Sequence, residues 1–224
     1  MLFRSVLEDA QLLAVVKPAG LPTANAPVGV PSVYTILRNS LTTGDFLGVV
    51  SRLDAPVSGG QAGAENGVLT VMCGSDDEAA FARAAEVIAS YSRSCVRLGT
   101  AGAGQLAKMV NQVCIAGLVQ ALSEGIAFAS NAGLDPHAVL DVISKGAAQS
   151  WQMENRGHTM ADGKFDFGFA VEWMVKDLGF VIDEARRNGS SVPVTETVLG
   201  YYRELMGSGS SRLDTSSLIT RLPR

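Results

Sequence analysis

The longest apolar stretch of the chain predicts a central helix. It starts after Gly99, is filled by good helix-forming residues that are apolar on nearly every side, and stops at Gly133, a typical end signal. Three polar residues near its start interrupt this pattern: Gln105, Lys108 and Asn111. Their spacing of three residues places them along one face. The sequence therefore predicts a buried central helix with a polar face close to its beginning.

The rest of the chain separates into a strand-bearing first part and a helical second part. Short apolar runs bounded by Pro and Gly predict strands at 12–16, 46–50, 68–73 and 95–98, with helices at 32–39 and 78–89. Beyond the central helix, apolar spacing predicts helices at 135–145, 153–162, 172–188 and 193–206, and a short turn at 214–219. We expect a mostly α protein with a small α/β part, in which a few Rossmann-like strands precede an all-helical bundle.

Composition and charge exclude several classes of protein. The chain has 224 residues and is 47% hydrophobic, enough for one large domain or two small ones. Its net charge of −4 argues against an extended nucleic-acid surface. The most apolar run, 113–122, is too short to span a bilayer, and charged residues from Arg4 to Asp9 interrupt any N-terminal signal. We therefore expect a cytoplasmic protein with neither a nucleic-acid nor a membrane partner.

The cysteines and histidines give no metal or disulfide pattern. Cys73, Cys95 and Cys114 lack the spacing of a zinc site, and we interpret them as reduced thiols in the core. His137 and His158 have no partners at metal-ligand spacing and are interpreted as surface or cap residues. The sequence thus predicts no metal site.

Lys108 is the strongest candidate for chemistry. The positive end of the helix dipole and desolvation both disfavour an ammonium in the first turns of a buried helix. Both effects favour the neutral amine and lower the pKa toward the range of a general acid or base. The alternative is that Lys108 extends to water from a partly exposed turn. The helix by itself leaves both interpretations open.

The glycines that open the central helix suggest a second possibility. Gly102 to Ala107 matches G-x-G-x-x-A after a strand and before a helix, which resembles a dinucleotide fingerprint. A Rossmann unit needs a second strand soon after its helix, with an acid for the ribose, and here the helix continues into further helices. The favoured alternative is that Gly102 and Gly104 let the helix and a strand approach closely.

Four motifs in order make residues 54–222 resemble the 3-hydroxyisobutyrate dehydrogenase (β-hydroxyacid dehydrogenase) family. They are Asp-Ala-Pro-Val-Ser-Gly-Gly at 54–60, Gly102-x-Gly104-x-x-x-Lys108-x-x-Asn111, the segment 146–151, and Lys-Asp-Leu-Gly at 176–179. The resemblance implies a Rossmann domain followed by an all-helical domain like that of 6-phosphogluconate dehydrogenase, with the active site in the cleft between them.

The same resemblance implies roles for individual residues. Lys108 would be the catalytic acid/base while hydride passes between a small 3-hydroxy acid and the nicotinamide of NAD or NADP. The substrate-binding residues would be Ser58, Gly59, Gly60 and Asn111, and the cofactor-binding residues Lys176 and Gly104. The usual second asparagine of the family is Gln112 here, which we expect to point away from Asn111. Without the resemblance, Lys176 and Asp177 would be interpreted as an exposed ion pair.

The beginning of the chain resembles a different family. Residues 9–23, 48–54 and 58–59 make residues 1–59 similar to the large pseudouridine synthase family, in which the aspartate at the position of Asp54 is catalytic. We therefore expect a fusion of two truncated genes with three parts: a synthase-like fragment at 1–53, a truncated Rossmann part at 54–101 and an all-α dehydrogenase domain at 102–224. Residues 1–53 contain no G-x-G-x-x-G, so we expect weak or absent binding of NAD(P) by this chain alone.

Three functional hypotheses follow from these patterns. The first is a 3-hydroxyacid dehydrogenase impaired by its truncated cofactor half. The second is a non-catalytic helical module that forms a homo-oligomer, because a large helical surface must be covered. The third is a pseudouridine synthase that acts on RNA uridine through Asp54.

Overall fold

The computed structural model describes the backbone of residues 4–8 and 13–16 and, in full, residues 53–223. The chain divides into two units, Met1–Arg52 and Leu53–Arg224. In the first unit, β1 (Arg4–Glu8) and β2 (Leu13–Val16) pair as antiparallel strands. The strand predicted at 12–16 is therefore confirmed, whereas the helix predicted at 32–39 and the strand predicted at 46–50 lie outside the described residues.

A small sheet begins the second unit. Its elements are β3 (Leu53–Asp54), β4 (Val57–Ser58), α2 (Gly60–Glu65), β5 (Leu69–Ser75), α3 (Glu78–Ile88) and β6 (Ser92–Gly99). β5 is the central strand, with β6 parallel to it on one side and with β3 and β4 antiparallel to it on the other. Leu69, Val71, Cys73 and Ile88 form the core between this sheet and α3. The predicted strands at 68–73 and 95–98 and the helix at 78–89 are confirmed.

Two features of this sheet differ from the prediction. The strand expected at 95–98 starts three residues earlier, at Ser92, because its pairing with β5 extends that far. Residues 53–65, for which no regular structure was predicted, hold two strands of two residues and a short helix. Strands this short have no measurable periodicity of their own and exist because β5 offers them backbone partners.

Cysteine placement is partly as expected. Cys73 and Cys95 lie on neighbouring strands with their sulfur atoms 3.6 Å apart, and all three cysteines are free thiols. Burial, followed by the hydrogen bond to Cys95, raises the pKa of Cys73 to about 12. Cys114 is exposed, so its assignment to the core was wrong.

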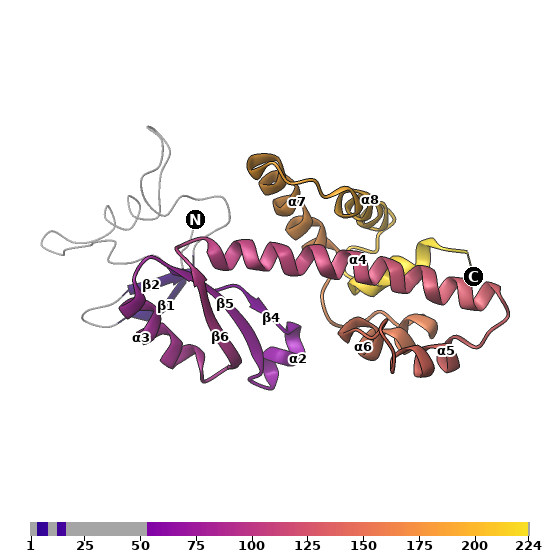
Figure 1. The fold of residues 1–224 in the computed structure, drawn as a ribbon, viewed down its shortest axis with the longest axis horizontal. Helices are drawn as coiled ribbons and strands as arrows, with labels where there is room; N and C mark the ends of the chain where they lie inside the picture. Colours follow the sequence, from indigo (N-terminus) through magenta and orange to yellow (C-terminus); the bar gives the residue numbers. More distant parts are fainter. Residues whose placement is uncertain (1–3, 9–12, 17–52, 224) are drawn as a thin grey trace, which may run out of the picture. The chain divides into compact units, whose positions relative to one another are not determined.

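A helical bundle forms the rest of the second unit. Its members are α4 (Ala103–Asn131), α5 (Pro136–Ile143), α6 (Trp151–Ala161), α7 (Val171–Asn188), α8 (Pro193–Gly207) and the 3₁₀ helix η1 (Thr215–Arg221). In Figure 1 the long helix α4 runs between α5 and α6 on one side and α7 and α8 on the other, in agreement with their packing contacts. The main core of the bundle includes Ala116, Met174, Leu178, Tyr202 and Leu218, all essentially inaccessible to solvent. The mostly α fold with a small α/β part is thus confirmed.

The central helix is less buried than predicted. Ala116 and Val119 are fully buried, but Val110 and Phe128 are 64% and 74% exposed. The expectation of a helix buried on all sides was wrong because its neighbours cover only part of its circumference. At 29 residues, α4 is also long and apolar enough to cross a bilayer, although the apolar run within it was judged too short. Core helices of water-soluble bundles pass the same test, so this observation is weak evidence for a membrane span.

Candidate active site

The beginning of α4 is fixed to the sheet by a carboxylate. Asp54, at the end of β3, accepts hydrogen bonds from the backbone N–H groups of Gly102 (2.6 Å) and Gln105 (2.8 Å). A carboxylate at this place satisfies two of the free donors of the first turn and complements the helix dipole. The structure therefore gives Asp54 a capping role that connects the sheet to the bundle.

The two glycines of the helix start serve different purposes. Gly104 is buried, and a Cβ atom there would collide with the carbonyl oxygen of Met72 on β5 and with the Asp54 carboxylate. The close approach of helix and strand expected from the sequence is therefore found at Gly104. Gly102 has open space around it, but its φ of 103° lies in the region that favours glycine. Asp54 thus occupies the N–H groups of Gly102 and Gln105, and the role of Gly104 seen here is to let the helix pack closely on β5.

Lys108 lies one turn into α4 and is half-buried. Desolvation lowers its pKa from the ordinary 10.5, the nearby Asp177 carboxylate acts in the opposite sense, and Lys176 lowers it further. Among residues 53–223, the Lys108 amine has neither a hydrogen bond nor an ion pair of its own. Its direction of shift is the one expected for a group that exchanges protons near neutral pH.

A chain of polar contacts links the Lys108 face of α4 to α7. The amide nitrogen of Asn111 donates to Oε1 of Gln112 (2.8 Å), and Nε2 of Gln112 donates to Oδ2 of Asp177 (2.7 Å). The other oxygen of Asp177 pairs with Lys176 Nζ at 3.1 Å. The structure thus brings Asn111 and Lys176 into one network whose central carboxylate also acts electrostatically on Lys108.

Two members of this network were misjudged from the sequence. Gln112 was expected to point away from Asn111, but it is only 2% exposed and bonds to it directly. Asp177 was not predicted as a site residue, although its side chain is only 15% exposed and joins both helices. The one available signal was its place in the Lys-Asp-Leu-Gly motif. The alternative interpretation as an exposed ion pair fits Lys176, whose side chain is 57% exposed, but it does not fit Asp177.

Ser58, Gly59 and Gly60 lie where β4 ends and α2 begins, and Ser58 pairs with Thr70 near the beginning of β5. Gly59 and Gly60 have φ values of 133° and 61°, and Gly59 is the N-terminal cap of α2. Exposed backbone with such angles can present amide groups to an anion. Within residues 53–223, no hydrogen bond connects this turn to Lys108 or Asn111.

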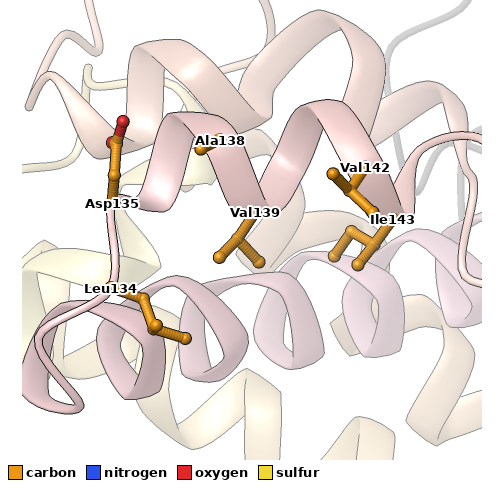
Figure 2. Close-up of a pocket in the computed structure, with 6 residues that line it drawn as sticks. All are labelled: Leu134, Asp135, Ala138, Val139, Val142 and Ile143. Carbon is orange, nitrogen blue, oxygen red and sulfur yellow. The ribbon is translucent and has the colours of Figure 1, made fainter.

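A shallow apolar groove of about 330 Å³ lies apart from these residues. It is lined by Leu134, Asp135, Ala138, Val139, Val142 and Ile143, at and before α5. Figure 2 shows Leu134, Val139 and Ile143 projecting into the same space beneath α5. None of the predicted site residues lines this groove, so it does not mark the candidate active site.

Comparison with known families covers nearly all of the second unit. Residues 102–222 match the domain described as the NAD-binding of NADP-dependent 3-hydroxyisobutyrate dehydrogenase, and residues 48–99 match the NAD binding domain of 6-phosphogluconate dehydrogenase. The expected cofactor, NAD or NADP, agrees with both descriptions.

Individual relatives give the same result. An uncharacterized oxidoreductase of Shewanella frigidimarina is 61% identical over 175 residues, which are 78% of this chain and 60% of the relative. The L-threonate dehydrogenase of Cupriavidus necator is 34% identical over 211 residues, 94% of this chain and 69% of the relative. The crystal structure of 3-hydroxyisobutyrate dehydrogenase from Salmonella typhimurium superposes with a TM-score of 0.69 at 35% identity, covering 77% of this chain and 60% of that chain.

These matches also bear on the first residues of the chain. The chain spans between 51% and 60% of the length of three curated relatives that it matches. The 6-phosphogluconate dehydrogenase match starts at residue 48, inside the segment that resembled a pseudouridine synthase, and the C. necator enzyme aligns with 94% of the chain. The expected synthase fragment and gene fusion therefore find no support, and Asp54 has the structural role described above.

Proposed function

Because the chain belongs to the 3-hydroxyisobutyrate dehydrogenase family, we propose that it is part of an NAD(P)-dependent oxidoreductase that acts on a small 3-hydroxy acid. The observation that carries this proposal is Lys108: a half-buried amine with a lowered pKa, one turn from Asn111 and beside the Asp177 carboxylate. Such an amine can exchange protons and lies on a polar helix face, and a purely structural lysine requires neither property.

The proposed mechanism assigns one proton transfer to the chain. NAD(P), when bound, supplies the hydride acceptor or donor. During oxidation, the neutral Lys108 amine takes the hydroxyl proton of the substrate at Nζ, and during reduction the ammonium returns it. Asn111 has one amide N–H engaged by Gln112 and a second N–H free to bind the substrate carboxylate. Ser58, Gly59 and Gly60 are proposed to bind that same carboxylate through a hydroxyl and backbone amides.

The cofactor would lie on the Lys176 side of the network. Lys176 is 57% exposed and can direct its ammonium to a phosphate or ribose while it stays paired with Asp177. The Gly102–Ala107 turn fits a pyrophosphate poorly, because Asp54 already accepts from the N–H groups of Gly102 and Gln105 and because Gly104 is packed on β5. We therefore propose that this chain alone binds NAD(P) weakly.

Two experiments test this function in order. Quenching of tryptophan fluorescence by NADH and NADPH measures cofactor binding, and saturation at micromolar concentration would contradict the weak binding proposed here. A steady-state assay with a panel of 3-hydroxy acids, including 3-hydroxyisobutyrate and L-threonate, then measures turnover with both cofactors. We expect any turnover to be lost in Lys108→Ala, and turnover that persists in this variant would refute the assigned role of the lysine.

We also propose that the helical part forms a homo-oligomer and that the protein is cytoplasmic. Leu106, Val110, Leu118 and Phe128 leave apolar surface on α4 that a second copy could cover. Light scattering of the purified chain tests this, and a monodisperse monomer at micromolar concentration would contradict it. Cell fractionation tests the location.

A further inference from the structure

The two histidines of the chain lie next to each other where α5 packs against α6. His137 and His158 are the only histidines in the sequence and are 21 residues apart. Their Nδ1 atoms lie 2.7 Å from each other, and the ring planes are within 15° of parallel. The ring centroids are 5.0 Å apart, which the two ring radii and the N–N distance together account for. Each Nδ1 lone pair is therefore directed along the line to the other ring.

The outer nitrogens of both rings face carboxylates. Nε2 of His137 lies 3.1 Å from Oδ1 of Asp162, and Nε2 of His158 lies 3.2 Å from Oδ1 of Asp141. The second oxygen of Asp162 accepts a hydrogen bond from Nζ of Lys164 at 2.9 Å, so this carboxylate serves as an acceptor on both sides. An ionised carboxylate only accepts hydrogen bonds, which places a proton on Nε2 of each histidine.

This arrangement leaves two acceptor nitrogens facing each other. With Nε2–H on both rings, a neutral pair presents two lone pairs at 2.7 Å, a distance suited to a hydrogen bond and not to two acceptors. A cation between the nitrogens removes this conflict. The cation is either a shared proton or a metal ion that takes its place.

The surroundings match those of metal-binding imidazoles. A histidine that binds a metal usually donates its second ring N–H to a carboxylate, which fixes the tautomer and makes the free nitrogen more basic. Here both histidines have such a partner, and each carboxylate comes from the other histidine's helix. Asp162, the C-cap of α6, faces His137, and Asp141 on α5 faces His158. The side chains are 42% and 45% exposed, so water can reach the space between them.

We propose that His137 and His158 bind one first-row transition-metal ion through their Nδ1 atoms, with water as the remaining ligands. Imidazole nitrogens favour Cu²⁺, Ni²⁺ and Zn²⁺, whereas Mg²⁺ and Ca²⁺ require oxygen ligands. Metal–nitrogen bonds of about 2.0–2.1 Å require the two nitrogens to separate to roughly 3–4 Å, a small rotation for two partly exposed rings. No group of three His, Cys, Asp or Glu side chains suited to a metal lies within residues 53–223, so the protein supplies two ligands.

The exchange between proton and metal is balanced. Binding of M²⁺ by the two Nδ1 atoms displaces any proton that lies between them to the solvent, and no other bond is broken. The bound ion would cross-link α5 to α6, which also meet through the two His–Asp pairs and through apolar contacts such as those of Leu140 and Met153. This inference does not depend on the proposed oxidoreductase activity.

Isothermal titration calorimetry with CuCl₂ and ZnCl₂ tests the site. The full chain is used with Cys114→Ser, because the exposed thiol is a competing ligand. We expect one ion per chain, bound more tightly for Cu²⁺ than for Zn²⁺. His137→Gln or His158→Gln should each weaken binding at least tenfold. Asp183→Asn, a surface change on α7, is the matched control and should leave the affinity unchanged.

A second measurement covers the loss of a carboxylate partner. Asp141→Asn or Asp162→Asn should weaken metal binding about 10–100-fold, as changes to such partners do at other metal sites. Thermal unfolding reports the cross-link independently, because ligand binding to the folded state raises the melting temperature in wild type and not in the histidine variants. Binding that is unchanged in both histidine variants, or absent in wild type because the pair holds only a proton, would overturn the proposal.

Discussion

Replacement of Asp54 tests whether this residue joins the sheet to the bundle. In Asp54→Ala, the N–H groups of Gly102 and Gln105 lose the carboxylate that accepts them at 2.6 and 2.8 Å. Loss of a single N-cap costs about 0.5–2 kcal/mol, and a hydrogen bond to a charged group contributes about 1.5–3 kcal/mol. Because Asp54 is only half-buried and water can replace part of the interaction, we expect a loss of about 2–3 kcal/mol in the free energy of unfolding.

The experiment is urea denaturation followed by circular dichroism. For a chain of this size, the expected loss corresponds to a decrease of about 5–10 °C in melting temperature. Asp54→Asn keeps one acceptor oxygen and loses the charge, so we expect about half the effect. Asp76→Asn is the control, because that exposed carboxylate accepts only the N–H of Ala101, at 3.0 Å. A change below about 0.5 kcal/mol in Asp54→Ala, the usual size for an ordinary surface position, would refute the capping role.

Three further predictions follow from the same site. Asp177→Asn should lower the pKa of Lys108 further, because the charge of Asp177 raises that pKa. Competitive acetylation followed by mass spectrometry measures the pKa of the amine, and an unchanged or raised value would contradict the electrostatic role of Asp177. Gly104→Ala should destabilise the protein by about 1–3 kcal/mol, because an added Cβ has no space there. Gly117→Ala, with open space on the same helix, should stabilise the protein by about 0.5–1 kcal/mol. Equal effects of the two changes in thermal melts would contradict this difference. Lys108→Met should raise the free energy of unfolding near pH 7 by about 0.5–2 kcal/mol. That gain should shrink as pH rises toward 10.5, because above its lowered pKa the folded wild type binds fewer protons than the unfolded chain and becomes more stable; a gain independent of pH would refute the desolvation of the amine.

The sequence by itself determined the helical part of this protein. Apolar spacing of 3 and 4 residues, with Asp135 before one helix and Gly189 after another, is local information, and the helices appear within a few residues of their predicted bounds. The packing role of Gly104 could also be predicted from the sequence, because a glycine after a strand and at the start of a helix permits close packing. The resemblance of residues 54–222 to the dehydrogenase family rests on such short motifs, and the family comparison confirms it.

Only the tertiary structure decided which surfaces meet. The apolar composition of α4 does not reveal that Val110 and Phe128 face outward, because exposure depends on where α5 to α8 pack. Gln112 bonds to Asp177 across 65 residues, and His137 meets His158 across 21, at spacings that no local pattern encodes. Helix periodicity fixes the face on which a side chain lies, but the partner on the opposing element is set by how whole helices pack, so the polar networks of this protein became visible only in the folded chain.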